Sequence, residues 1–516
     1  MPTLVAVDAV GIQRFVFASN RLRDAVGASG LVEWAVSPEA LDLDPLFAAG
    51  GNAVLQFASR DAAKAWTAAY TRRLLEKAPG LEMAVAHRYY EKGALARALR
   101  ALLQVDLARA KTERRPSVPL LGLGVTAVCR ETGQPAVALA QPPEQVPISC
   151  LVEAARGRLE LSNQRWRREL IGGWKTPDGR PLRFPLELDH LGGTKHTRSL
   201  LGVVHVDGNG VGGRIRDWLH SREGAPDARV AKELREWSQA LTKRAEGALK
   251  AVTRRVIGAL ILADGKVEVG GKLRALDFAL DSKDGHVFLP LRPILLGGDD
   301  VTFVCDGRLA LDLAVTAATE MAGEVPHLGA VSACAGVAVV PLQTPFVRAY
   351  QLSDALCQSA KRERQRRGWK GGVIDWHVGT VRPGESVDVL RLSQFATQDT
   401  LSLTCRPYPL MEGQLTWSWL RETLLGDGPT GLRGPYWADR HGKVRRLADI
   451  AREGPGAVER ALRAWQVSER RLALPSLIPY GFFEKHTPLV DAVELLDRAQ
   501  VLVPAGALAS VGGEAR

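Results

Sequence analysis

The feature that most constrains the fold of this chain is a degenerate internal repeat. A strand-like run that ends in an aspartate and a glycine turn occurs at residues 4–12 and again at 202–212. Both copies continue with a helix, a Gly-Gly turn leading into a strand, a helix with apolar residues at three- and four-residue spacing, and a further strand. Closing helices with basic ends, each followed by a last strand, are predicted at 93–115 and 125–128 in the first copy and at 346–367 and 373–376 in the second.

This order of elements predicts the fold class. The series β-α-β-β-α-β is the ferredoxin-like split βαβ arrangement, so we expect an α+β protein with two ferredoxin-like units. The alternative is two unrelated α/β domains. The second unit also carries an insertion with a long helix over residues 228–257. The predicted domains are a first unit at 1–130, a connector subdomain at 131–194, a second unit at 195–392 and a C-terminal, mostly helical domain at 393–516.

The two Gly-Gly turns differ where chemistry would need side chains. The second copy reads Gly297-Gly298-Asp299-Asp300, and the first reads Gly50-Gly51-Asn52-Ala53. Glycines permit the positive φ of a tight hairpin and the close approach of a ligand. Adjacent aspartates supply hard oxygen ligands of the kind that Mg²⁺ and Mn²⁺ prefer. Because the first copy lacks both acids, the hairpin does not need them for folding.

A third acid is predicted to join this pair. Asp207 ends the first strand of the second unit, and in a split βαβ sheet that strand lies beside the hairpin. Three carboxylates at one edge repel one another unless cations neutralise them. For Asp207 alone, capping of the turn is the simpler interpretation. Taken together, Asp207, Asp299 and Asp300 are predicted to be catalytic and to bind two Mg²⁺ or Mn²⁺ ions, as in nucleotidyl transfer.

Other residues near these acids are predicted to bind the nucleotide. The turn Gly208-Asn209-Gly210 leads into a helix, whose free N–H groups can receive phosphate oxygens. Gly297 and Gly298 are expected to shape the pocket. Lys361 stands near the end of a basic helix that the topology places at the same edge, where its ammonium could contact a triphosphate. A basic helix end also favours the helix dipole without any ligand.

Composition narrows the cellular context. The net charge of +11 favours anionic partners such as nucleotides, nucleic acid or an acidic protein, although many arginines can also reflect a GC-rich genome. Six cysteines are scattered without C-x-x-C pairs or disulfide-like spacing, which is typical of a reducing cytoplasm. No apolar run approaches the ~18 residues that span a bilayer, so we expect a cytoplasmic protein without a membrane partner.

Several motifs in order resemble a known family. The first unit opens with Asp8-Ala9-Val10-Gly11-Ile12-Gln13-Arg14-Phe15, the second carries Gly-Gly-Asp-Asp, and Thr404-Cys405-Arg406-Pro407-Tyr408 follows. Over roughly residues 1 to 410 the chain is similar to the large polymerase-like subunit of type III CRISPR effector complexes.

That resemblance implies two palm domains, the first inactive and the second joining ATP into cyclic oligoadenylates, which act as antiviral second messengers. It also implies that Asp207, Asp299 and Asp300 bind the metals, and that the Gln13 region faces a second nucleotide across the interface. The implied partners are ATP or another nucleoside triphosphate, RNA and CRISPR-type protein subunits.

The chain also departs from the pattern of that family. No HD nuclease domain is expected before the first palm, because the first strand starts at residue 3 or 4. The zinc ribbon between the palms is reduced to Cys129 and Cys150, too few for a four-ligand site. These departures favour a reduced or stand-alone relative.

Two functions remain open from the sequence. The first is a cyclase that condenses nucleoside triphosphates, and the second is a non-catalytic RNA-binding scaffold in which the palms serve assembly. The retained acids of the second palm favour the enzyme. The sequence leaves base preference, product ring size, the activating partner and the oligomeric state undetermined.

Overall fold

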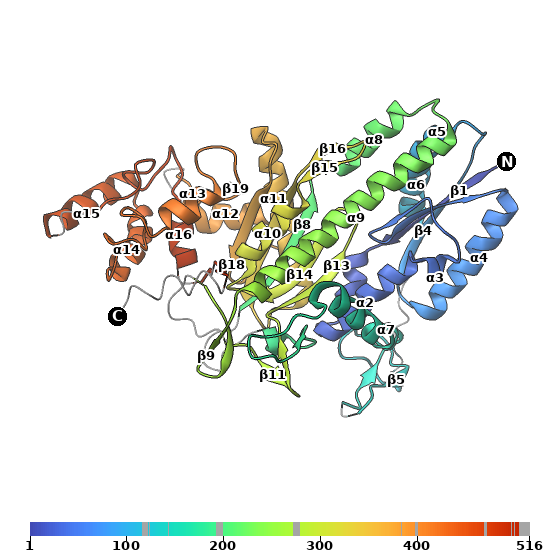
Figure 1. The fold of residues 1–516 in the computed structure, drawn as a ribbon, viewed down its shortest axis with the longest axis horizontal. Helices are drawn as coiled ribbons and strands as arrows, with labels where there is room; N and C mark the ends of the chain where they lie inside the picture. Colours follow the sequence, from blue (N-terminus) through green and yellow to red (C-terminus); the bar gives the residue numbers. More distant parts are fainter. Residues whose placement is uncertain are drawn as a thin grey trace.

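The computed structural model shows an elongated α+β protein, with the first palm at one end and the C-terminal helices at the other (Figure 1). It describes residues 1–504 except 116–121, 123, 143, 192–199, 272–278, 383, 398–400, 469–471, 497 and 500. The predicted boundary between the connector and the second palm, at 194/195, lies outside these residues. Among the helices that are described, none is both long and apolar enough to cross a membrane.

The first palm has the predicted ferredoxin-like sheet. Its four strands are antiparallel in the order β2-β3-β1-β4. The predicted helix at 13–28 is two helices instead, because the chain turns at residues 17–21. The elements are β1 (Thr3–Val10), α1 (Ile12–Val16), α2 (Leu22–Ala35), α3 (Pro38–Leu41), β2 (Phe47–Ala49), β3 (Asn52–Phe57), α4 (Arg60–Lys77), β4 (Glu82–Tyr89), α5 (Leu95–Ala101), the π-helix η1 (Leu102–Asp106) and α6 (Leu107–Glu113).

The closing strand predicted at 125–128 in the first palm is wrong. Val125 is 94% exposed, and Val128 makes only an isolated bridge, to Pro135. The backbone groups of this segment bond to the connector instead, since Ala136 N donates to Ala127 O at 2.9 Å. In the described sheet β4 remains the edge strand, and this segment does not pair with it.

The second palm repeats the fold and extends it. Its sheet has the order β13-β14-β8-β17-β18-β19, in which β18 runs parallel to β17 after the crossover helix α11. The predicted closing strand at 373–376 and the insertion helix at 228–257 are both confirmed. The main elements are β8 (Leu200–Gly208), α8 (Val211–Ser221), α9 (Asp227–Gly258), β13 (Leu291–Leu296), β14 (Asp300–Asp306), α10 (Ala310–Met321), β17 (Ala333–Pro341), α11 (Phe346–Arg367), β18 (Val373–Val378) and β19 (Tyr408–Pro409).

The main helix of the connector packs on the first palm. Helix α7 (Cys150–Trp166) lies along α2, and two glycines of α2 permit the close approach. A Cβ added at Gly27 would lie 1.9 Å from Ala155 O, and one at Gly30 would lie 1.9 Å from Ser162 Oγ. The short elements here are β5 (Ala138–Leu139), β6 (Pro147–Ile148), η2 (Arg167–Ile171), β7 (Leu182–Arg183) and η3 (Leu188–Leu191). The domain bounds themselves remain a prediction.

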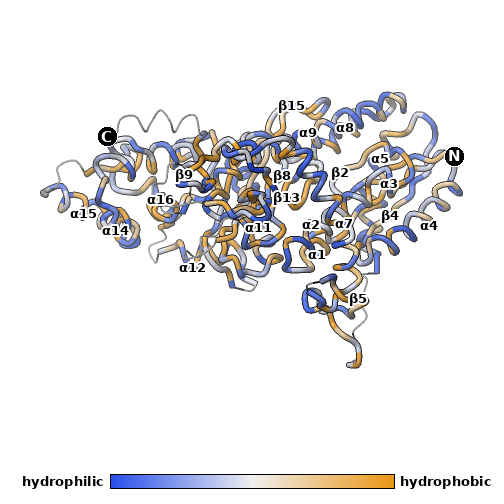
Figure 2. Tube along the Cα trace, turned by 60° about the horizontal axis from the view of Figure 1, so that its bottom comes forward, coloured by the Kyte–Doolittle hydropathy of each residue, from blue (hydrophilic) through white to orange (hydrophobic). Residues whose placement is uncertain are grey.

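Figure 2 shows apolar residues concentrated around β8 and β13 at the centre, whereas α8 at the periphery is largely hydrophilic.

The C-terminal part is mostly helical, as predicted. Residues 393–409, at the start of the predicted C-terminal domain, contain the end of a helix and β19, and residues 398–400 lie outside the described part. The remaining elements are β9 (Leu260–Ala263), β10 (Lys266–Val269), β11 (Ser282–Lys283), β12 (His286–Phe288), β15 (Gly323–Val325), β16 (Gly329–Val331), α12 (Val387–Phe395), α13 (Trp417–Trp419), η4 (Leu420–Leu424), α14 (His441–Ala451), α15 (Pro455–Ser468) and α16 (Leu489–Leu496).

Candidate active site

The three predicted acids lie at one end of the second-palm sheet. In the antiparallel register of β8 and β14, Asp300 stands directly opposite Asp207. Asp299 precedes it in the turn, and Gly208 N donates to Asp299 O at 2.8 Å. Residues paired across antiparallel strands share a face of the sheet, so Asp207 and Asp300 project to the same side. The fold therefore brings together acids that are far apart in sequence.

The electrostatics of these acids show a crowded negative site. Burial and then the charge of Asp207 raise the pKa of Asp299 to about 6. Burial followed by the charges of Asp299 and Asp207 raises the pKa of Asp300 to about 7. Within the described residues, no group of three or more His, Cys, Asp or Glu side chains is already arranged to hold a metal ion. The carboxylate oxygens are nevertheless suitable ligands for divalent cations. A bound cation would also reduce the repulsion among the three acids.

Lys361 belongs to this site through Asp207. Its Nζ lies 2.6 Å from Asp207 Oδ2 and donates to Gly208 O at 2.8 Å. Burial of the amine opposes its protonation, but the charge of Asp207, its hydrogen bond to Lys361 and the other nearby acidic groups together raise the pKa of Lys361. The ammonium thus neutralises one acid and fixes the end of β8. The predicted contact between Lys361 and a triphosphate stays a prediction.

The glycines bring the hairpins of the two palms into contact. A Cβ added at Gly50 would lie 3.2 Å from Gly298 N, and one at Gly298 would lie 3.0 Å from Ala49 Cβ. Gly210 has a φ of 69° and begins α8, a conformation that favours glycine even though an added Cβ there would meet no atom. The first palm therefore lies directly against the predicted catalytic turn.

Asn209 is anchored inward by a residue that the sequence did not indicate. Its backbone N donates to Ser332 O at 2.8 Å, and its side-chain Nδ2 donates to Ser332 Oγ at 3.0 Å. Ser332 Oγ in turn donates to Lys370 O at 2.8 Å. The Asn209 side chain thus holds the turn in place, and its predicted contact with the nucleotide stays a prediction. No motif marks Ser332, which lies more than a hundred residues further along the chain.

The first palm keeps a remnant of the same arrangement. Asp8 pairs with Lys111 as Asp207 pairs with Lys361, and each acid stands three residues before a positive-φ glycine that precedes a helix. Asp8 stands opposite Asn52, whose amide nitrogen, turned toward the carboxylate, donates to both Asp8 oxygens at 2.6 and 2.9 Å. The register therefore makes Asn52 the counterpart of Asp300. The comparison of the two Gly-Gly turns in the sequence had aligned Asn52 with Asp299 instead.

Gln13 is exposed and also contacts the second palm. Its Nε2 donates to the hydroxyl of Tyr350 at 3.3 Å. The Tyr350 ring packs edge-on against His205, whose Nδ1 lies 3.0 Å from Thr302 Oγ1 on β14. Burial lowers the pKa of His205, which favours the neutral imidazole. The predicted role of Gln13 at a second nucleotide remains a prediction.

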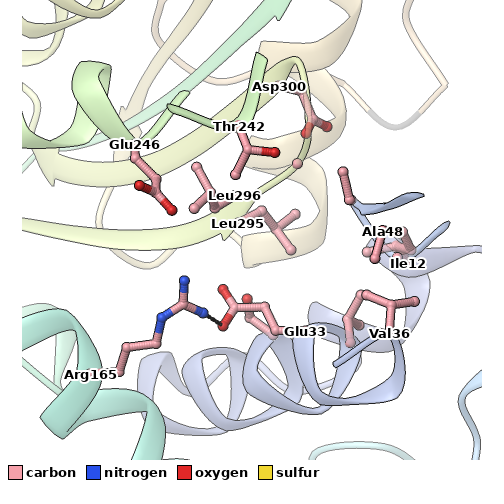
Figure 3. Close-up of a pocket in the computed structure, with 16 residues that line it drawn as sticks. Ile12, Glu33, Val36, Ala48, Arg165, Thr242, Glu246, Leu295, Leu296 and Asp300 are labelled. Carbon is pink, nitrogen blue, oxygen red and sulfur yellow. Dashed lines mark hydrogen bonds and ion pairs between the residues drawn. The ribbon is translucent and has the colours of Figure 1, made fainter. Parts of the chain in front are cut away.

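A cavity of about 150 Å³ lies between the palms behind the predicted catalytic turn (Figure 3). Asp300 and Gly297 bound it on one side. On the other side Glu33 of α2 pairs with Arg165 of α7, and burial raises the pKa of Glu33 despite this pair. The first palm and the connector thus face the hairpin across this cavity.

Comparison with known proteins points to one architecture. No protein-family model matches the sequence, and no curated protein matches it. Solved structures of a Csm1–Csm4 cassette, from the type III-A CRISPR-Csm system, do match. The complex with pppApA has a TM-score of 0.53 at 15% identity, covering 96% of this chain and 69% of that chain. The complex with one ATP has the same TM-score and identity, with 96% and 70% covered. The shared property is the fold.

The geometry of Gly297 gives a sharp prediction. A Cβ at this position would lie 1.5 Å from Asp300 Oδ1, so Gly297→Ala must displace the Asp300 carboxylate. We expect nucleotidyl transfer to fall at least tenfold while the protein remains folded. The control is Gly258→Ala at the end of α9, where an added Cβ meets nothing within 4 Å. Equal activities of the two variants would show that the position of Asp300 is unimportant.

The raised pKa of Asp300 predicts a pH-dependent cost in stability. The folded state retains the proton up to about pH 7, whereas the unfolded acid loses it near its ordinary value of 3.8. Stability of the metal-free protein therefore falls as pH rises through this range, and the cost is fully present above it. We expect Asp300→Asn to stabilise the protein by about 1–3 kcal/mol more at pH 8 than at pH 5.

Urea unfolding in EDTA at both pH values measures this difference. Adding Mg²⁺ at pH 8 should raise the stability of the wild type and leave that of Asp300→Asn nearly unchanged. A stability difference independent of pH would contradict the raised pKa.

Proposed function

We propose that this chain is a metal-dependent nucleotidyltransferase that condenses nucleoside triphosphates, most favourably ATP, into cyclic oligonucleotides for antiviral signalling of the type III CRISPR kind. The observation that carries the proposal is the register that sets Asp300 opposite Asp207 beside Asp299, at a turn whose counterpart in the first palm has Asn52. The fold supports it, because neighbours of this architecture were crystallised with AMPPNP, ATP and pppApA.

The metals would be held by the acids of the second palm. Asp207, Asp299 and Asp300 would bind two Mg²⁺ or Mn²⁺ ions, which supply positive charge to the reacting phosphate and lower the pKa of the attacking hydroxyl. Lys361 holds Asp207 in place from the other side. Residues Gly208 to Gly210 lead into the N-terminus of α8, where unpaired backbone N–H groups favour phosphate oxygens.

The reaction itself is a substitution at phosphorus. The 3′-oxygen of one nucleotide forms a bond to the α-phosphorus of another, and the bond from that phosphorus to the bridging oxygen breaks. Pyrophosphate leaves with that oxygen, and the hydroxyl proton passes to water. A final step of the same kind, within one oligonucleotide, closes the ring.

RNA and CRISPR-type protein subunits are proposed as partners in a reducing cytoplasm. The net charge of +11 supports an anionic partner. The competing function is a non-catalytic RNA-binding scaffold. The shared fold alone does not choose between the two functions, whereas the acids retained only in the second palm favour catalysis.

Purified protein incubated with the four nucleoside triphosphates and Mg²⁺ or Mn²⁺, with and without RNA, tests the proposal. Pyrophosphate release and mass spectrometry of the products are the readouts. We expect pyrophosphate together with cyclic products containing adenosine. Absence of both under every condition, accompanied by RNA binding, would establish the scaffold instead.

A further inference from the structure

A groove at the contact between the palms adjoins the turn after Asp207. It has a volume of about 400 Å³ and lies between η1 of the first palm and α8 of the second. Its walls include Leu103, Gln104, Gly213, Ile215, Arg216 and Leu219. Since α8 begins directly after Gly210, the groove starts where the proposed triphosphate site ends. Ligand sites commonly lie at such junctions between domains.

The lining of the groove suits a flat ring. Leu103, Ile215 and Leu219 give it an apolar floor with few polar groups, as in sites that bind the ring of a small ligand. A Cβ added at Gly212 would meet nothing within 4 Å, so the space over the start of α8 is open. At Gly213 the nearest atom would be Arg216 Nη2, at 3.7 Å. The guanidinium of Arg216 therefore lies near Gly213, one turn earlier on α8.

Gln104 stands on the opposite wall in an unusual piece of backbone. It lies in the π-helical segment η1, and such segments occur frequently at functional sites. Asp106 of the same segment accepts a bond of 2.8 Å from Arg88 Nη2 on β4. The preceding helix α5 is tied to the second palm by Arg100 Nη2, which lies 2.8 Å from Glu223 Oε1. Gln104 is thus exposed yet carried on a braced helix that faces α8.

From this arrangement we infer that the groove binds the nucleobase of the nucleotide whose phosphates lie at Gly208 to Gly210, and that Gln104 selects adenine. A side-chain amide presents one donor and one acceptor side by side, which matches the N6 amino group and the N7 acceptor of adenine. Guanine presents two acceptors on that edge, which suit arginine instead. The inference rests on the proposed function and names its base.

The test compares Gln104→Ala with Val105→Ala. Val105 neighbours Gln104 on η1, is 56% exposed and does not line the groove. Isothermal titration with Mg²⁺ and non-hydrolysable ATP and GTP analogues gives the ATP preference of the wild type and of each variant. We expect Gln104→Ala to reduce that preference about tenfold to a hundredfold and Val105→Ala to leave it unchanged. Thermal unfolding confirms that both variants are folded.

Other results would overturn the inference. An unchanged preference in Gln104→Ala would exclude Gln104, and a preference lost only in Arg216→Ala would assign base reading to Arg216. Failure of the wild type to bind either analogue would also overturn it. If the wild type binds the ATP analogue selectively through Gln104 but releases no pyrophosphate from ATP, the assignment of the groove to the base is supported and the proposed catalysis is wrong.

Discussion

Replacing both Asp299 and Asp300 by asparagine will reduce the rate of pyrophosphate release at least about a thousandfold, while the second palm stays folded. Loss of both carboxylates removes ligands of the proposed metals, whose charge stabilises the transition state by several kcal/mol. Folding should survive, because the first palm builds the same hairpin with an asparagine opposite Asp8. The measurement is pyrophosphate release from ATP, together with circular dichroism of the variant.

Asp217→Asn provides the matched control for this experiment. The substitution of Asp217 removes one negative charge, as each substitution in the double variant does. Asp217 lies on α8, is exposed and is not one of the three clustered acids. We expect its activity to equal that of the wild type within about twofold. Product formation by the double variant at the wild-type rate would refute the assignment of the site.

The second large effect concerns stability. Arg406 and Asp491 form an ion pair at 3.0 Å, and both side chains are fully buried between the second palm and α16. Asp491 also accepts bonds from Thr404 Oγ1 at 2.7 Å, Cys405 N at 2.8 Å and Tyr408 OH at 2.9 Å. Asp491→Ala would leave these three donors without their acceptor and would leave the buried Arg406 with Glu494, at 2.9 Å, as its remaining carboxylate partner. We expect a loss of about 3–5 kcal/mol in the free energy of unfolding.

Chemical denaturation of Asp491→Ala against Asp388→Ala measures this loss. Asp388 pairs with Arg362 at 3.3 Å, but its side chain is 75% exposed, so its removal should cost less than about 1 kcal/mol. A similar small cost at Asp491 would mean that the C-terminal helices do not depend on the buried pair. The sequence segment 404–408, noticed only as a family feature, thus has a structural role at the attachment of these helices.

Local sequence patterns predicted the elements whose apolar spacing is regular. Helix α11 has the predicted bounds, and α9 lies within one residue of them, because both have continuous faces of apolar and basic residues. The predicted strand at 125–128 failed because strand propensity does not reveal the partner of a segment, which here is the connector and not the sheet. The predicted alignment of the two Gly-Gly turns was also wrong by one residue. A turn can differ in length by one residue between the two palms, whereas the pairing of the strands is fixed by which side chains face the core.

The duplication, the fold class and the identity of the acids follow from the amino-acid sequence, because they depend on local periodicity and on residue types. Which groups meet depends on the packing of distant segments. The register placed Asp300 opposite Asp207, the helix end placed Lys361 on Asp207, and long-range packing brought Ser332 to Asn209 and Gln104 to α8. Contacts between residues a hundred positions apart follow from how sheets and helices pack, and no local pattern encodes them.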